Sequence, residues 1–240
     1  MADEPCNQLS VVSYQLSETA IPEARTPKPE GKLHHSPSAA MAKAREMADA
    51  AQNLADLELA VRQFDGCALK KTATKTVFAD GNPNAKIMVI GEAPGAQEDV
   101  QGIPFCGQSG QLLDKMLAAI GLSRAETVYI SNTIFWRPPG NRQPSPEETA
   151  ICLPFVEKHI ALISPDLLIL FGGTATNTLL NNDLSMSRLR GKFYEYSNTY
   201  IEKPIKTAVS YHPSYLLRQP LAKKQAWQDL LMVKDFLSKN

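Results

Sequence analysis

The sequence predicts an α/β protein with three layers, α/β/α, around a central four-stranded parallel sheet. Four short apolar runs, at 87–90, 128–130, 167–171 and 208–210, have the length and composition of buried strands. Segments with helical spacing separate these runs, and a turn or a polar cluster follows each of them. Strands that alternate with helices pair in parallel and are covered by helices on both faces.

The 240 residues divide into three predicted segments. Residues 1–38 hold five prolines and few large apolar side chains, so we expect a flexible leader. Residues 39–64 are rich in alanine, with Leu57 and Val61 at helical spacing, which predicts a helical segment that docks on the main domain. Residues 65–240 form that domain.

Three helices of the main domain have recognisable ends. Ser109 is placed to cap a helix that Gly121 stops. Ser145 and Glu148 have the spacing of a capping box, which starts a second helix that ends before Pro165. The last helix is expected to bury four apolar side chains: Trp227, Leu230, Leu231 and Leu237.

Composition restricts the class of protein. The chain has 25 basic and 25 acidic residues, a net charge of zero that argues against coating nucleic acid through bulk charge. Local basic clusters still suffice to hold phosphates. No apolar run approaches the roughly 18 residues of a membrane span, so we expect no membrane contact. Four scattered cysteines do not make a disulfide framework, which favours a reducing, cytoplasmic location.

Polar side chains or glycine turns follow all four predicted strands. Glu92 follows the first strand within the turn sequence Gly-Glu-Ala-Pro-Gly, and Asn132 follows the second. The third strand ends in Gly172-Gly173, and His212 follows the fourth. Open α/β sheets bind ligands beyond the carboxyl ends of their strands, so this convergence predicts an active site.

These segments resemble the family-4 uracil-DNA glycosylases, in the family's order and spacing over most of residues 64–238. The matching motifs are GEAPGAQED at 91–99, GIPFCGQSGQLLDKML at 102–117, VYISN at 128–132, RPPGNR at 137–142 and HPSYLLR at 212–218. The resemblance implies a DNA repair hydrolase of base excision repair. Such an enzyme cleaves the N-glycosidic bond of deoxyuridine in DNA, releases uracil and leaves an abasic site.

The resemblance also assigns the residues that bind uracil. A flipped base needs a pocket that reads its pyrimidine edge. Phe105 is implied as the plate on which uracil stacks, with Gly91 and Ala93 beside it. The Asn132 amide both donates and accepts, which matches uracil O4 and N3–H and mismatches cytosine.

Two residues are expected to be catalytic. His212 is placed to donate to uracil O2 as negative charge collects on the base. Glu92 is placed to stabilise the sugar cation and to orient the attacking water. Ala93 stands where relatives outside family 4 carry an aspartate, so Glu92 is the nearest carboxylate for this task. The roles of Glu98 and Asp99 stay open.

DNA is the implied partner, either single- or double-stranded, and the family expectation is a monomer. Leu217 or Arg218 is expected to fill the gap left by the flipped base. Further DNA contacts are expected from Arg142, Gly173 and Ser214.

One departure from the family concerns its 4Fe–4S cluster, which four cysteines usually hold. The first and third ligand positions carry Phe64 and Trp136, and only Cys67 and Cys152 remain. Two thiolates do not hold a cluster that normally takes four. We therefore expect neither a metal nor any other cofactor, with packing in the volume of the cluster.

Two other readings stay open at this point. One is a non-catalytic module that binds uracil-containing or single-stranded DNA, which the joint presence of Glu92, Asn132 and His212 disfavours. The other is a relative that links covalently to the abasic site through a histidine in an added loop. The corresponding segment, 137–144, contains no histidine, so hydrolysis is preferred.

Overall fold

The computed structural model describes residues 36–239 and contains one mixed sheet in that range. Its parallel core consists of β2 (Ile87–Gly91), β3 (Val128–Asn132), β4 (Leu167–Phe171) and β6 (Ile205–Ser210). The strand order is β1-β3-β2-β4-β6-β5, in which β2 pairs with both β3 and β4. The predicted four-stranded parallel core is confirmed.

Two antiparallel edge strands extend this core, and the sequence did not reveal them. The strand β1 (Asp80–Gly81) is two residues long and pairs with β3. The strand β5 (Phe193–Tyr196) pairs with β6, and three of its four residues are not buried. A two-residue strand and a half-exposed edge strand lack the continuous apolar run that marks a buried strand.

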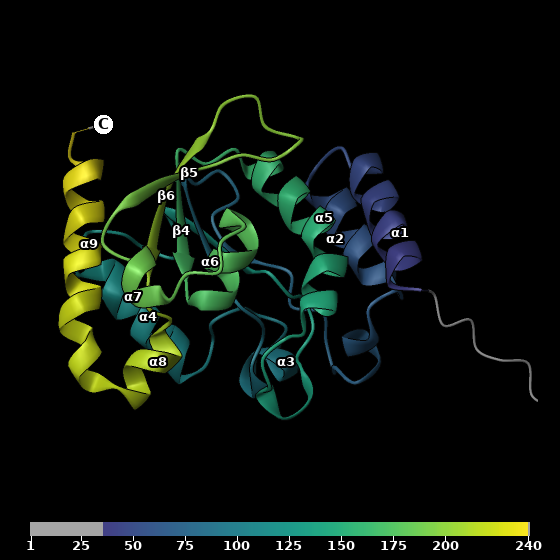
Figure 1. Ribbon diagram of the computed structural model, residues 1–240, viewed down its shortest axis with the longest axis horizontal. Helices are drawn as coiled ribbons and strands as arrows, with labels where there is room; N and C mark the ends of the chain where they lie inside the picture. Colours follow the sequence, from purple (N-terminus) through teal and green to yellow (C-terminus); the bar gives the residue numbers. More distant parts are fainter. Residues whose placement is uncertain (1–35, 240) are drawn as a thin grey trace, which may run out of the picture. The chain divides into compact units, whose positions relative to one another are not determined.

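Helices cover both faces of the sheet, as predicted (Figure 1). On one side lie α1 (Pro37–Ala50), α2 (Leu54–Gln63) and α5 (Pro146–Ile163). On the other lie α4 (Gln108–Ala118), α8 (Pro213–Arg218) and α9 (Lys223–Leu237). The shorter helical elements are α3 (Ala96–Gln101), α6 (Gly173–Leu180), α7 (Met186–Leu189) and the 3-10 turns Ala68–Lys71, Pro139–Asn141 and Pro220–Ala222.

The alternation of side chains along each strand creates two hydrophobic cores. Along β2, Met88 and Ile90 point into the core beneath α1, α2 and α5. Ile87 and Val89 point into the core that includes residues of α4, α8 and α9. Both sets are almost completely buried, which is why these strands read as continuous apolar runs.

Several local predictions require correction. Gly107, not Ser109, is the N-cap of α4. Trp227 and Leu231 are 41% and 42% exposed, so they are not core residues of α9. The capping box of α5 is confirmed, because Ser145 Oγ accepts from the Glu148 amide and the Glu148 carboxylate accepts from the Ser145 amide.

The N-terminal helical segment forms two helices with a break at Ala51–Asn53, and Asn53 caps the second helix. Its buried residues belong to the same core as α5. The predicted leader lies outside the described residues up to residue 35, and α1 begins at Pro37. Within residues 36–239, no helix is long and apolar enough to cross a membrane.

Candidate active site

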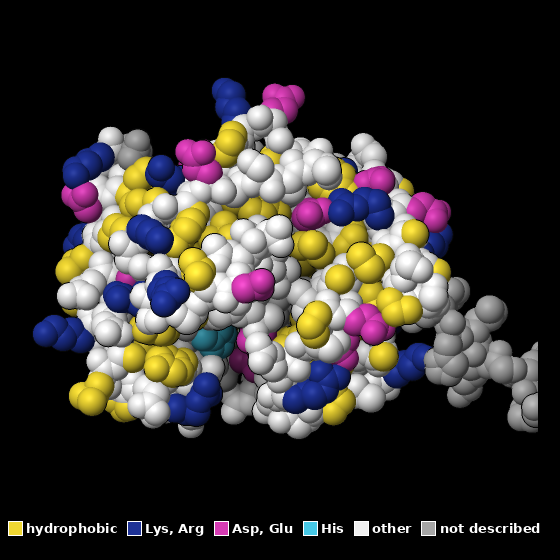
Figure 2. All heavy atoms as spheres, viewed as in Figure 1, with side chains coloured by type: hydrophobic (Ala, Val, Ile, Leu, Met, Phe, Trp, Pro, Cys, Tyr) yellow, Lys and Arg dark blue, Asp and Glu magenta, His cyan; other side chains and the backbone are white. Residues whose placement is uncertain are grey.

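The carboxyl ends of the parallel strands surround a cavity of about 690 Å³, which we call the strand-end cavity. Figure 2 shows a histidine side chain within a hollow, with an acidic side chain directly beside it and hydrophobic side chains nearby. Nine of the eleven predicted site residues line the cavity: Glu92, Ala93, Phe105, Asn132, Arg142, Gly173, His212, Ser214 and Arg218. Gly91 lies buried behind it, and Leu217 is 41% exposed outside it.

Glu92 is held in one orientation by a chain of hydrogen bonds. Thr174 Oγ1 donates to Glu92 Oε2 at 2.6 Å, and Gln143 Nε2 donates to Thr174 Oγ1 at 3.0 Å. The backbone carbonyl of Glu92 accepts from Thr133 Oγ1 at 2.7 Å. One carboxylate oxygen is thus engaged, which leaves Oε1 for a ligand or a water molecule. Sequence reasoning missed these hydrogen bonds, because Thr174 lies 82 residues from Glu92.

Asn132 is 2% exposed at the end of β3, and it lines the cavity. No group within residues 36–239 hydrogen-bonds its side-chain amide. Buried amides usually have partners, so this one is available to a ligand. Gly91, its partner in the sheet, must be glycine, because an added Cβ would lie 2.6 Å from Asn132 Oδ1 and 2.4 Å from the Phe105 ring.

The ring of Phe105 forms an apolar wall beside this amide. It is 5% exposed and stacks against the His212 imidazole, with 5.3 Å between ring centroids and 28° between planes. Phe105 has a φ of +51°, in the left-handed region that non-glycine residues seldom adopt. The sequence suggested the ring's role and gave no indication of this backbone conformation.

His212 is the N-cap of α8, and its tautomer follows from its contacts. The backbone N–H of Ser214 donates to Nδ1 at 3.2 Å, so Nδ1 carries a lone pair. Ser214 Oγ lies 2.8 Å from the same atom. Burial, with a smaller contribution from Arg218, lowers the pKa of His212 to about 4. At neutral pH the imidazole is therefore uncharged, and its proton is on Nε2.

Glu98 and Asp99, whose roles the sequence left open, anchor the loops around the cavity. The Glu98 carboxylate accepts from the backbone amides of Gly95, Cys106 and Gly107 at 2.9–3.1 Å. Asp99 accepts from the backbone and side chain of Thr74, at 2.7 and 3.0 Å. Both carboxylates are buried.

The residues expected to contact DNA lie around the mouth of the cavity. Leu217 and Arg218 are exposed at the end of α8. Ser214 contacts His212 through both its amide and its hydroxyl group. The Arg142 guanidinium forms a bidentate pair with Glu148 at 2.6 and 2.9 Å, so it is already engaged within the chain.

Aromatic side chains fill the region where the resemblance places a cluster, and we call Phe64, Cys67, Trp136 and Cys152 the aromatic plug. Phe64 and Trp136 are 2% and 1% exposed, with stacked rings 6.5 Å apart. Trp136 Nε1 donates to Thr76 Oγ1 at 3.0 Å. Cys152 donates to Cys67, and this bond together with burial raises the pKa of the Cys152 thiol well above its usual value.

The aromatic plug does not fit an iron–sulfur cluster. Two of its four side chains have no atom that ligates iron, and their rings pack on one another, while Phe64 also packs on Phe155 with 5.2 Å between ring centroids. Within residues 36–239, no group of three or more His, Cys, Asp or Glu side chains is placed to hold a metal ion.

The fold and the site together define an α/β protein whose strand-end cavity combines a carboxylate, an unengaged amide and a neutral imidazole. The family model described as the uracil DNA glycosylase superfamily matches residues 78–231, and the chain belongs to this superfamily.

Its similarity extends to individual curated relatives. The type-4 uracil-DNA glycosylase of Archaeoglobus fulgidus is 36% identical over 78% of this chain and 95% of the relative. That of Saccharolobus solfataricus is 40% identical over 74% of this chain and 83% of the relative. That of Thermotoga maritima is 36% identical over 75% of this chain and 92% of the relative.

Proposed function

We propose that this protein excises uracil from DNA by hydrolysing the N-glycosidic bond of deoxyuridine, which leaves an abasic site. The observation that carries this proposal is the Asn132 side chain, which is 2% exposed, lines the strand-end cavity and has no hydrogen-bond partner within residues 36–239. Its amide donor and acceptor are therefore both available to a ligand in the cavity.

Recognition of uracil follows from the chemistry of this amide. Its N–H₂ group donates to uracil O4, and its carbonyl accepts from uracil N3–H. Cytosine presents the reverse pattern and would leave buried groups unpaired. The Phe105 ring provides an apolar face for the base, while Gly91 and Ala93 keep the space beside it free of larger side chains.

His212 acts on the uracil side of the breaking C1′–N1 bond, and Glu92 acts on the sugar side. As the C1′–N1 bond breaks, its electron pair moves onto uracil, and His212 Nε2–H donates to O2 where negative charge collects. The sugar becomes a cation that the Glu92 carboxylate stabilises. Water then attacks C1′ and gives a proton to Glu92, while Thr174 holds the other carboxylate oxygen.

The partner in this proposal is uracil-containing DNA. Exposed Leu217 and Arg218 are suited to fill the gap of the flipped nucleotide, with Gly173 and Ser214 near the phosphates. Arg142 would reach DNA only by exchanging its bond with Glu148. The free buried thiols of Cys67 and Cys152 support a reducing, cytoplasmic setting.

We propose further that the enzyme works without an iron–sulfur cluster. The support is that Phe64 and Trp136 fill the volume with packed aromatic rings and tie the segment before Cys67 to the segment before α5. No catalytic step above requires a metal ion.

A base-release assay tests the activity directly. Wild-type protein is incubated with an oligonucleotide that contains one deoxyuridine, and the products are separated on a denaturing gel with and without alkali. We expect free uracil and an alkali-sensitive abasic site. Binding without release would favour the non-catalytic module, and a cross-linked band that survives denaturation would favour the covalent relative.

A further inference from the structure

The loop of residues 102–107 holds Phe105 in an unfavourable backbone conformation. Its φ of +51° brings the Cβ atom close to the backbone, so this conformation persists only where surrounding contacts impose it. The loop also lies directly against α4, because an added Cβ on Gly110 would lie 1.6 Å from the Phe105 carbonyl oxygen.

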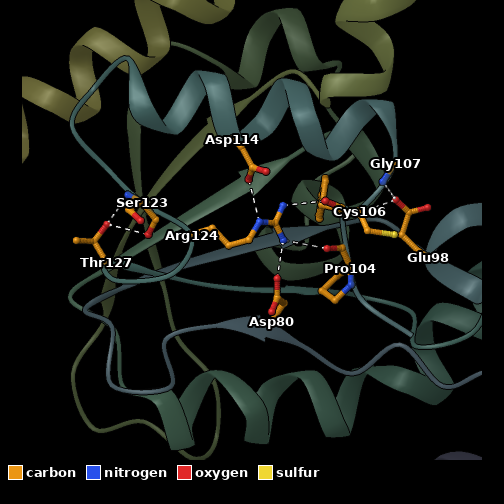
Figure 3. Close-up of polar contacts among 10 residues, drawn as sticks. Asp80, Glu98, Pro104, Cys106, Gly107, Asp114, Ser123, Arg124 and Thr127 are labelled. Atoms are coloured by element: carbon orange, nitrogen blue, oxygen red, sulfur yellow. Dashed lines mark hydrogen bonds and ion pairs between the residues drawn. The ribbon is translucent and has the colours of Figure 1, made fainter. Parts of the chain in front are cut away.

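Arg124 supplies contacts that impose this conformation. Its Nη2 donates to the Phe105 carbonyl at 2.8 Å, and its Nη1 donates to the Pro104 carbonyl at 3.1 Å. Asp80 on β1 and Asp114 on α4 each accept from the same guanidinium at 2.9 Å (Figure 3). Two carboxylates thus fix the orientation of the planar guanidinium that donates to the loop.

These contacts hold the peptide groups on both sides of Phe105. The Pro104 and Phe105 carbonyls belong to the two peptide groups on either side of the Phe105 Cα atom. In an extended chain such carbonyls point in opposite directions, whereas in a helical conformation of either hand they point the same way. Glu98 accepts from the Cys106 amide at 3.1 Å, so the peptide group after Phe105 is held at both its oxygen and its nitrogen.

Arg124 does not line the strand-end cavity, and its side chain is 19% exposed. We propose that Arg124 is a positioning residue for uracil recognition, which acts through Phe105 by holding the ring beside Asn132 and His212. This inference rests on the proposed function, because it needs a base to stack on the ring.

The test compares two ligands that differ only in the base. Wild type, Arg124→Met and Arg124→Lys are measured for binding and single-turnover excision on a deoxyuridine oligonucleotide. Binding is also measured for the same oligonucleotide with a tetrahydrofuran abasic analogue. We expect Arg124→Met to lose about tenfold or more in excision and in uracil-dependent affinity. Affinity for the abasic analogue should stay within about twofold of wild type, because no base stacks there.

Lysine keeps the charge but presents a single ammonium group in place of the fork, so Arg124→Lys should recover only part of the loss. If Arg124→Met does not fold, Arg124→Lys carries the same comparison. Arg62→Met is the matched control, since Arg62 forms an exposed pair with Glu58 within α2, and it should behave as wild type.

A double-mutant cycle with Phe105→Ala tests whether Arg124 acts through Phe105. In that background Arg124→Met should cost little further excision, because the ring is already absent. Full additivity would overturn the inference, as would equal losses of affinity for the two oligonucleotides, which indicate a general structural role. Release of no uracil by wild type would instead refute the proposed function.

Discussion

The strand-end cavity and the aromatic plug use buried side chains in opposite ways. In the cavity, the Asn132 amide lines the wall with no partner within residues 36–239, and His212 keeps its Nε2 proton directed away from its contacts with Ser214. In the plug, Phe64 and Trp136 stack on each other, and the Trp136 indole N–H and the Cys152 thiol are both satisfied within the chain. The polar groups of the cavity remain available to hydrogen-bond a ligand, whereas the side chains of the plug hydrogen-bond and stack on one another.

This difference predicts that substitutions in the cavity lower the rate of turnover, whereas substitutions in the plug lower the stability of the fold. Side chains whose polar groups are available to a ligand stabilise the transition state and add little to the stability of the folded state. Their substitution should therefore lower turnover. Side chains that satisfy one another contribute to the folded state, so their loss should lower the free energy of unfolding and spare the rate per folded molecule.

The largest expected effect is that of Glu92→Gln. The substitution keeps the shape and removes the negative charge that stabilises the sugar cation, so turnover should fall by about 1,000-fold. Binding to uracil-containing DNA and the melting temperature should change little. Glu46→Gln, at an exposed ion pair on α1, is the control. Turnover within a few-fold of wild type would show that Glu92 is not the catalytic carboxylate.

Trp136→Ala should have the opposite signature. Trp136 is 1% exposed, so its truncation should cost about 3–5 kcal/mol of unfolding free energy in denaturant titrations. Excision per folded molecule should be preserved at a permissive temperature. Trp227→Ala, at a tryptophan that is 41% exposed, should cost far less. Equal costs for the two tryptophans would refute the packing role of the plug.

Acid should destabilise the protein through His159, a neighbour of the plug. Its ring stacks on Phe78, with 4.3 Å between centroids, and burial lowers its pKa from 6.5 to about 3. Between pH 6.5 and about 3, His159 is protonated in the unfolded chain and neutral in the folded chain. The free energy of unfolding therefore falls as pH falls. The loss should reach about 2 kcal/mol at pH 5.

The substitution His159→Gln isolates this contribution and keeps a partner for the Tyr129 hydroxyl, which lies 2.9 Å from His159 Nε2. Its unfolding free energy should depend less on pH between 6.5 and 3 than that of wild type. An unchanged slope would mean that His159 is not the group that titrates.

The smallest expected effect is that of Cys152→Ala. The thiol is fully buried, but alanine leaves only a small gap and removes one weak hydrogen bond, so the cost should be about 1 kcal/mol with excision intact. Cys67→Ala should behave alike. Loss of activity in either variant would indicate that these cysteines still serve as ligands of an iron–sulfur cluster.

The sequence was sufficient for the parts of the molecule that depend on local patterns. The four parallel strands follow from continuous apolar runs, and the convergence of Glu92, Asn132 and His212 follows from their positions at strand ends. The fixed orientation of Glu92 by Thr174, and of Phe105 by Arg124, depends on contacts between distant segments. The exposed face of α9 at Trp227 also has no local signature, since tertiary packing decides which apolar residues are covered.

The most direct measurement determines iron, sulfide and uracil release on one sample purified without oxygen. Because the aromatic plug replaces two ligands, the protein should be colourless and contain no stoichiometric iron or sulfide. It should also release uracil equally well before and after treatment with a chelator. A brown protein whose excision disappears together with its iron would contradict this account.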